Sequence, residues 1–216
     1  MKTNKLLYFV TLLTVVLTWM SCDNLQLQTN YDYQPEALDP HINMTAWEFM
    51  NSRPDIFSIM IDAVKYAEME DVYSQTDSVM TYLFINNTGM ESYVNARGLV
   101  SITSADVNKI RKLLQYHIIK GEYHAYAKKL PVEPIYVKNL LNEEDGLVTI
   151  KVNKSSQPSV GSPIANGNVV INETSSNFSS KRISSITSNL MPTNGVIHVF
   201  SDFSYYKSNV NDTPAY

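Results

Sequence analysis

The 216 residues of the chain suffice for one domain with a sizeable core. Apolar residues make up 44% and charged residues 18% of the sequence, a globular composition that excludes a disordered chain. The net charge is −4 and there is no long basic run, which argues against nucleic-acid binding. The single cysteine and the four scattered histidines indicate no metal site.

The first segment of the chain has the pattern of an export signal. Two lysines precede an apolar run from Leu6 to Met20, whose 15 residues are fewer than the about 20 that span a bilayer. The small residue Ser21 follows, and Cys22 comes directly after it. This arrangement resembles the lipobox of bacterial lipoproteins, in which the cysteine is acylated and becomes the new N-terminus. We therefore predict a lipoprotein signal peptide over residues 1–21 and lipidation at Cys22.

Residues 22–43 have few aliphatic side chains and no sustained periodicity, so we predict a tether between a lipid anchor and a folded domain. A flexible segment of this length has an r.m.s. span of roughly 25 Å. The expected location is the cell envelope after export, with the outer membrane favoured and exposure on the cell surface as one alternative. An ordinary exported protein with a free thiol at Cys22 is the less favoured interpretation, because such a thiol is a liability in an oxidising compartment.

The first half of the folded part reads mainly as helix. Ser52, Pro54 and Asp55 have the form of a helix start, and Thr103 with Asp106 gives a second capping signature. We expect a helix over 45–51 and an amphipathic helix over 54–67. The apolar stripe of the second helix consists of Ile56, Ile59, Met60, Ala63, Val64 and Ala67. A strand over 81–85, a turn over 86–89, a helical segment over 90–96 and a helix over 107–117 should follow, and Gly121 comes after the last helix.

The second half reads as strands, which we expect over 135–140, 146–152, 169–171, 182–187 and 196–203. Helices that precede strands indicate the α+β class. We interpret the acidic run 143–145 as a solvated turn rather than a calcium site, since it lacks the alternation of a binding loop.

Three stretches together resemble the fasciclin-like domain family. They are Asn194 to Phe203 (the second family signature), Leu113 to Tyr123 (the segment before it) and Tyr82 to Met90 with Phe84 and Asn86 (the first signature). The resemblance covers residues 44–205 and leaves a C-terminal tail over 206–216. It implies a single domain with a β-sheet wedge or sandwich flanked by several helices.

We expect mainly structural roles for the signature residues Phe84, Asn86, Asn194, Gly195 and His198. The strand over 196–200 is apolar on both faces, so it should be central, and a buried His198 needs a hydrogen-bond partner. Gly195 should stand where the backbone is tight.

Tyr116 and His117 are candidate partner-binding residues, because a tyrosine-histidine pair is implicated in receptor contact in some animal members of the family. We favour the structural alternative, in which His117 continues the buried stripe of its helix and bonds the backbone.

The resemblance implies adhesion or extracellular recognition rather than catalysis. The sequence contains no nucleophile elbow, zinc-protease motif, phosphate loop or dinucleotide fingerprint, so we predict no catalytic residue and no cofactor. The leading hypothesis is a non-enzymatic lipoprotein of a Gram-negative cell envelope, anchored in the membrane, whose partner is an extracellular or envelope protein. The first alternative, suggested by 14 tyrosines, is a glycan-binding accessory lipoprotein of an outer-membrane nutrient-uptake system. An enzyme comes third and would need a clustered pair of ionisable side chains in a deep pocket.

Overall fold

The computed structural model describes residues 39–126, 130–141, 146–153, 167–173, 180–207 and 213–214, all within the second of two compact units, which begins at residue 38. The predicted signal peptide, Cys22, the tether up to residue 38 and the acidic run 143–145 lie outside the described residues. In the part of the chain that is described, no helix has the length and apolar character to cross a membrane.

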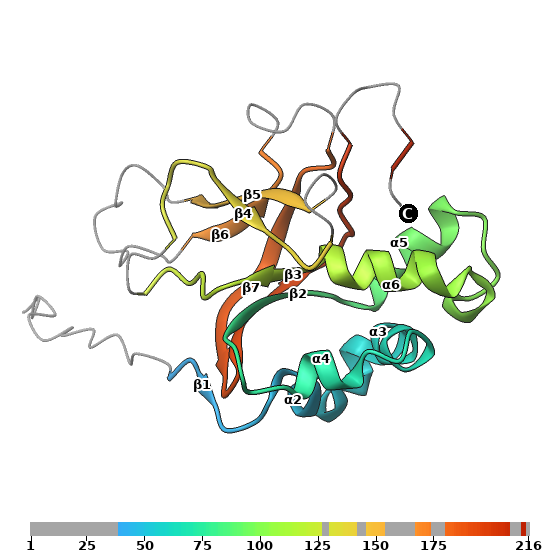
Figure 1. The fold of residues 1–216 in the computed structure, drawn as a ribbon, viewed down its shortest axis with the longest axis horizontal. Helices are drawn as coiled ribbons and strands as arrows, with labels where there is room; N and C mark the ends of the chain where they lie inside the picture. Colours follow the sequence, from blue (N-terminus) through green and yellow to red (C-terminus); the bar gives the residue numbers. More distant parts are fainter. Residues whose placement is uncertain are drawn as a thin grey trace, which may run out of the picture. The chain divides into compact units, whose positions relative to one another are not determined.

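Helices dominate the first half of the described chain (Figure 1). They are α2 (Ala46–Ser52), α3 (Pro54–Tyr66), α4 (Glu70–Ser74), α5 (Asn87–Ala96), the 3-10 helix η1 (Ile102–Ser104) and α6 (Val107–Tyr116). The predicted helices over 45–51, 54–67 and 107–117 are confirmed within one or two residues. The short helix α4 had no counterpart among the predicted elements.

Of the two predicted capping signatures, the first was wrong and the second is confirmed only at Asp106. Ser52 does not cap α3, because its hydroxyl donates to the carbonyl oxygen of Phe49 at 2.7 Å and so ends α2 instead. Arg53 precedes α3 without a side-chain cap, and Pro54 opens the helix. At α6 the capping group is Asp106 itself, whose Oδ1 accepts from the backbone nitrogen of Asn108 at 2.8 Å.

The predicted turn over 86–89 is the first turn of α5. Asn86 is the N-cap, and its Oδ1 accepts from the backbone nitrogen of Gly89 at 3.0 Å. Asparagine favours both turns and N-caps, so the local pattern could not separate the two. An ideal Cβ on the buried Gly89 would lie 2.8 Å from the backbone nitrogen of Asp202, so glycine lets α5 approach the segment after the last strand.

The strands form one mixed sheet with the order β3-β2-β8-β7-β6-β5-β4, and β1 is added to β7. Their bounds are β1 (His41–Ile42), β2 (Met80–Ile85), β3 (Ile118–Lys120), β4 (Ile135–Lys138), β5 (Leu147–Asn153), β6 (Asn168–Ile171), β7 (Ile183–Pro192) and β8 (Gly195–Phe200). The pairs β2–β8 and β1–β7 are parallel and the other neighbours are antiparallel. A bridge between Ile119 and Asn139 brings β3 to the end of β4, which nearly closes the sheet. The predicted α+β class is confirmed.

The central position of β8 is confirmed. It lies between β2 and β7, and all six of its residues are buried. A Cβ on Gly195 would overlap the carbonyl oxygen of Met80 on the neighbouring strand, so the backbone is tight there as predicted.

Several sheet segments differ from the prediction. β3 had no counterpart among the predicted strands, and β8 ends at Phe200 rather than at 203. β7 runs five residues beyond the predicted end at 187, and the register shifts along its pairing with β8 between Ser185 and Leu190 hide the alternation that marks a strand. His41 and Ile42 pair with Met191 and Pro192, although they belong to the predicted tether. The folded unit therefore begins before residue 44.

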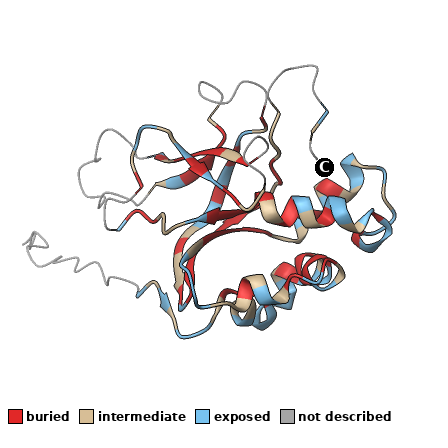
Figure 2. Cartoon of the chain, viewed as in Figure 1, coloured by how far each residue is buried: buried red, intermediate tan, exposed pale blue. Residues whose placement is uncertain are grey.

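The core lies between the sheet and the inner faces of the helices (Figure 2). An aromatic cluster fills its centre, where the ring centroids of Phe57 and Phe84 are 5.3 Å apart and those of Tyr73 and Tyr82 are 5.5 Å apart. On α3 the buried stripe is rotated from the predicted one, since Phe57 and Ile61 are buried whereas Ile56 and Ile59 are only half-buried. Ile59 is thereby left at a surface groove.

Candidate recognition surface

Asn194 stands at the turn between β7 and β8 and is buried. Its Oδ1 accepts from the backbone nitrogen of Ala46 at 2.8 Å, and its Nδ2 donates to the Tyr73 carbonyl oxygen at 2.9 Å and to the Tyr82 hydroxyl at 3.1 Å. Burial raises the pKa of Tyr82 to about 12, so this hydroxyl remains neutral. Asn194 therefore joins α2, α4 and β2 and has no side-chain group left for a ligand.

His198 occupies the middle of β8 and is fully buried. Its Nδ1 accepts from the backbone nitrogen of Asn189 at 3.1 Å, and its Nε2 donates to the carbonyl oxygen of Tyr123 at 2.9 Å. Burial lowers the pKa of His198 to about 4, so the ring is neutral near pH 7. Both ring nitrogens serve the fold, in agreement with the structural interpretation of this residue.

Tyr116 and His117 lie at the end of α6, and both side chains are buried. The Nδ1 of His117 donates to the Leu113 carbonyl oxygen at 2.8 Å, and its Nε2 accepts from the backbone nitrogen of Ser204 at 3.1 Å. Burial lowers the pKa of His117 to about 4. The arrangement agrees with the structural alternative for His117, and neither residue of the candidate pair is presented to a partner in this structure.

The Tyr116 hydroxyl belongs to a second buried polar cluster. It accepts from the Nδ2 atom of Asn172 at 2.7 Å, and the same nitrogen donates to the Ser204 hydroxyl at 2.9 Å. Burial raises the pKa of Tyr116 above its usual value. This cluster ties α6 to the segments after β6 and β8. Its members are far apart in the chain, so it could not be predicted from local sequence patterns.

A groove with a volume of about 440 Å³ lies between α3, α5 and the segment 100–102. We call it the α3–α5 groove. The half-buried Ile59 and Val94 and the buried Ile102 form the apolar part of its lining. Asp62 on α3 and Glu91 on α5 are exposed and add a carboxylate from each helix.

The walls of the α3–α5 groove are fixed by the side chain of Asn87, at the start of α5. Its Oδ1 accepts from the backbone nitrogen of Ile59 at 3.1 Å, and its Nδ2 donates to the Asp55 carbonyl oxygen at 3.3 Å. Asn87 thus bonds the N–H group of Ile59 and the carbonyl group of Asp55, which lie one helical turn apart on α3. The sequence prediction missed it, because an asparagine near a helix start reads as a cap or turn residue.

The rim of the groove is set by the end of α5. The backbone nitrogens of Gly98 and Leu99 donate to the carbonyl oxygens of Asn95 and Val94 at 3.1 and 3.0 Å, which is a Schellman motif. Gly98 has a φ of +63°, a left-handed conformation that suits glycine. The motif turns the half-buried Leu99 toward the core and leaves the next side chain, Val100, 95% exposed.

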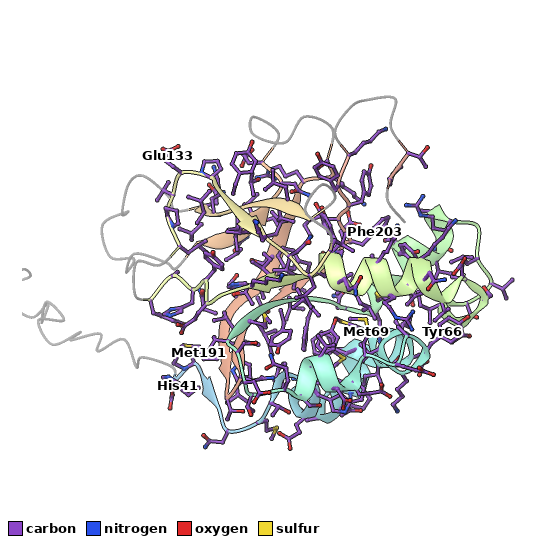
Figure 3. All side chains as sticks on the ribbon, viewed as in Figure 1. His41, Tyr66, Met69, Glu133, Met191 and Phe203 are labelled. Carbon is purple, nitrogen blue, oxygen red and sulfur yellow. The ribbon has the colours of Figure 1, made fainter. Side chains whose placement is uncertain are left out.

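The two carboxylates of the groove come from Asp62 and Glu91. Both side chains are exposed, and within the described segments no nucleophile or base is held to either by a hydrogen bond. In the same segments, no three His, Cys, Asp or Glu side chains are grouped so that they could hold a metal ion. Figure 3 shows the side chains over the described chain; among the labelled residues, Tyr66 and Met69 lie at the α3 side and Glu133 at the opposite end.

Other exposed apolar and aromatic side chains lie on β4 and in the chain that precedes it. Tyr126 and Tyr136 are 47% and 54% exposed, and Val132 is 49% exposed. Exposed tyrosine rings offer flat, amphipathic faces to a ligand.

Comparison with known proteins identifies the fold. The profile of the Fasciclin domain family matches residues 55–203. A solved structure of a FAS1 domain pair from the insect cell adhesion molecule Fasciclin I aligns with a TM-score of 0.53 and 16% sequence identity over 74% of this chain. The alignment covers half of that solved chain. No curated protein matches the sequence at a significant level. Since the profile covers more than half of its residues, the chain belongs to the Fasciclin domain family.

Proposed function

We propose that the protein is an exported, non-enzymatic lipoprotein that is anchored in the cell envelope through Cys22 and recognises an extracellular protein through its fasciclin domain. Membership of the Fasciclin domain family carries this proposal. The insect protein with a similar fold is a cell adhesion molecule. The proposed anchor rests on the sequence, in which an apolar run and Ser21 precede the single cysteine.

The use of the buried polar groups supports a binding role over a catalytic one. Asn194, His117 and His198 are buried, and their hydrogen bonds join elements of the fold. The groups that remain available for recognition are exposed, such as those of the α3–α5 groove. A domain of this kind presents a rigid surface to a partner.

The anchor is tested by lipid labelling. Cells that express the full chain receive a labelled fatty acid, and the chain is then isolated from the membrane fraction. We expect label on the wild type and on the control Ser21→Gly, which keeps a small residue before the cysteine, but none on Cys22→Ser. Label on Cys22→Ser, or membrane retention of that variant without label, would contradict anchoring at Cys22.

Recognition is tested by counting the attachment of cells that carry or lack the chain to surfaces coated with extracellular proteins or with glycans. We expect chain-dependent attachment to protein-coated surfaces and its loss with Cys22→Ser.

The exposed Tyr126 and Tyr136 favour glycan binding as the second candidate function. Attachment to glycan alone that disappears with Tyr126→Ala and Tyr136→Ala would establish this candidate and overturn protein recognition.

A further inference from the structure

The α3–α5 groove has the chemistry of a peptide-binding site. We propose that it binds a segment of a protein partner in which an aliphatic side chain stands two residues away from a lysine or arginine. This proposal rests on the proposed recognition function and specifies the surface and the partner chemistry.

The apolar part of the groove selects the aliphatic side chain. Ile59, Val94 and Ile102 line it, and Val100 exposes 95% of its surface at the rim. Contact with an apolar side chain removes these surfaces from water, which is favourable. The volume of about 440 Å³ lies within the range of about 300–1,000 Å³ that is usual for ligand pockets.

The charges of the groove select the cation. Asp62 and Glu91 come from opposite walls, and neither forms an ion pair with any described residue. The described lining contains no lysine, arginine or histidine. A cationic side chain therefore complements the groove, whereas phosphate groups, acidic sugars and acidic peptides meet like charge.

The lining also favours a peptide over a sugar. No aromatic ring belongs to the described part of the lining, so the groove offers no flat face for stacking against a sugar. The exposed Tyr126 and Tyr136 do not belong to this lining. Alternate side chains of an extended peptide point to the same side. An aliphatic side chain can therefore lie between the helices while a basic side chain two residues away lies against the carboxylates.

The groove is held in shape before a ligand arrives. Asn87 bonds α5 to α3 at one end, and the Schellman motif after Val94 fixes the loop that carries Val100 at the other. A site whose walls are already ordered loses less conformational entropy on binding.

The test uses the full chain, purified in detergent, and an array of dodecapeptides in a Gly/Ser background. Each peptide carries two test residues separated by one glycine, and the peptides are named by these pairs as Leu-Lys, Leu-Arg, Leu-Glu and Ser-Lys. The affinities of the peptides are then measured in solution by fluorescence anisotropy. We expect the Leu-Lys and Leu-Arg peptides to bind at least about tenfold more tightly than the other two. No binding of these peptides, or equal binding of the Leu-Glu peptide, overturns the proposal.

Charge variants test the carboxylates. We expect the double variant Asp62→Asn/Glu91→Gln to lose about threefold to tenfold in affinity for the Leu-Lys peptide, as two exposed ion pairs would give. The control Asp77→Asn/Glu133→Gln removes the same charge from two exposed residues outside the groove and should keep the affinity. An equal loss in both double variants indicates non-specific attraction and overturns the site.

A third variant, Val100→Ser, tests the apolar contact and should also weaken binding of the Leu-Lys peptide. All substituted side chains are exposed, so thermal unfolding should remain that of the wild type. A negative array with chain-dependent cell attachment retained overturns the groove assignment alone. Absence of cell attachment by the wild type instead overturns the proposed function.

Discussion

Asn87 on α5 accepts a hydrogen bond from the backbone nitrogen of Ile59 on α3 at 3.1 Å. The same side-chain amide donates to the carbonyl oxygen of Asp55. These two helices, which are separated by α4 and β2 in the sequence, are thereby held at a fixed spacing. The α3–α5 groove lies between them, so its shape depends on one polar side chain as well as on apolar packing.

Replacement of Asn87 by alanine should loosen this spacing. We expect Asn87→Ala to lower the free energy of unfolding by about 1–2 kcal/mol, because two backbone groups of α3 lose a partner. Urea unfolding measures the loss. The control Asn95→Ala removes an exposed asparagine from the same helix and should change stability by less than about 0.5 kcal/mol. Equal effects of the two substitutions would show that Asn87 contributes no more than an ordinary surface residue.

Substitution of Asn194 should lower the free energy of unfolding far more than substitution of Asn87. We expect Asn194→Ala to cost about 3 kcal/mol or more, because it leaves the buried Ala46 nitrogen and the groups around Tyr82 without their partner. Chemical denaturation of the variant, with Asn95→Ala again as the control, measures this cost. A loss below about 1 kcal/mol would refute the structural role that we assign to Asn194.

Alanine substitutions at Gly195 and Gly98 test how closely the backbone is packed at each position. An alanine at Gly195 would place its Cβ on the carbonyl oxygen of Met80, which forces β2 and β8 apart. An alanine at Gly98 meets no atom within 4 Å and suffers only the strain of its left-handed backbone, which costs about 1–2 kcal/mol. We therefore expect a clearly lower melting temperature for Gly195→Ala than for Gly98→Ala. The reverse order would contradict the close pairing of β2 with β8.

Acid should destabilise the domain through its two buried histidines. The pKa values of His117 and His198 are lowered to about 4 by burial, against about 6.5 in the unfolded chain. Between these values the unfolded state binds more protons than the folded state, so stability falls as the pH falls from 6.5 to 4. The expected slope is about 1.4 kcal/mol per pH unit for each histidine.

Urea unfolding at several pH values between 4.5 and 6.5 tests this linkage. His117→Gln and His198→Gln should each lower the slope of the unfolding free energy against pH by about 1.4 kcal/mol per pH unit, which corresponds to one proton. His41→Gln is the control, because that ring is exposed. Equal slopes in the wild type and in the variants of both buried histidines would show that neither residue governs the acid response.

The sequence predicts those parts of the fold that depend on local pattern. The apolar run around His198 indicates a strand buried on both faces, and Gly195 marks a tight backbone because no other residue fits there. The helices α3 and α6 are also predicted, because their apolar residues recur at helical spacing. The register of β7 is not, because its bulges break the alternation on which the prediction depends.

The candidate recognition surface lies beyond local pattern. Its residues come from α3, α5 and the segment 100–102, and only the tertiary packing brings them together. Gly98 signals the end of α5, but the exposure of Val100 depends on how Leu99 packs against the core. Asn87 carries no local sign that its amide reaches another helix. A single sequence therefore predicts the framework of this domain but not its recognition surface.

Protease treatment of intact cells that express the full chain tests the central claim, recognition outside the cell, most directly. A domain-specific antibody follows the chain, a periplasmic protein reports the integrity of the outer membrane, and Cys22→Ser serves as the unanchored control. Our account predicts that the domain is digested while the periplasmic marker remains intact, and that the Cys22→Ser cells carry little of the domain on their surface. Full protection of the domain alongside the marker would place it inside the envelope and contradict extracellular recognition.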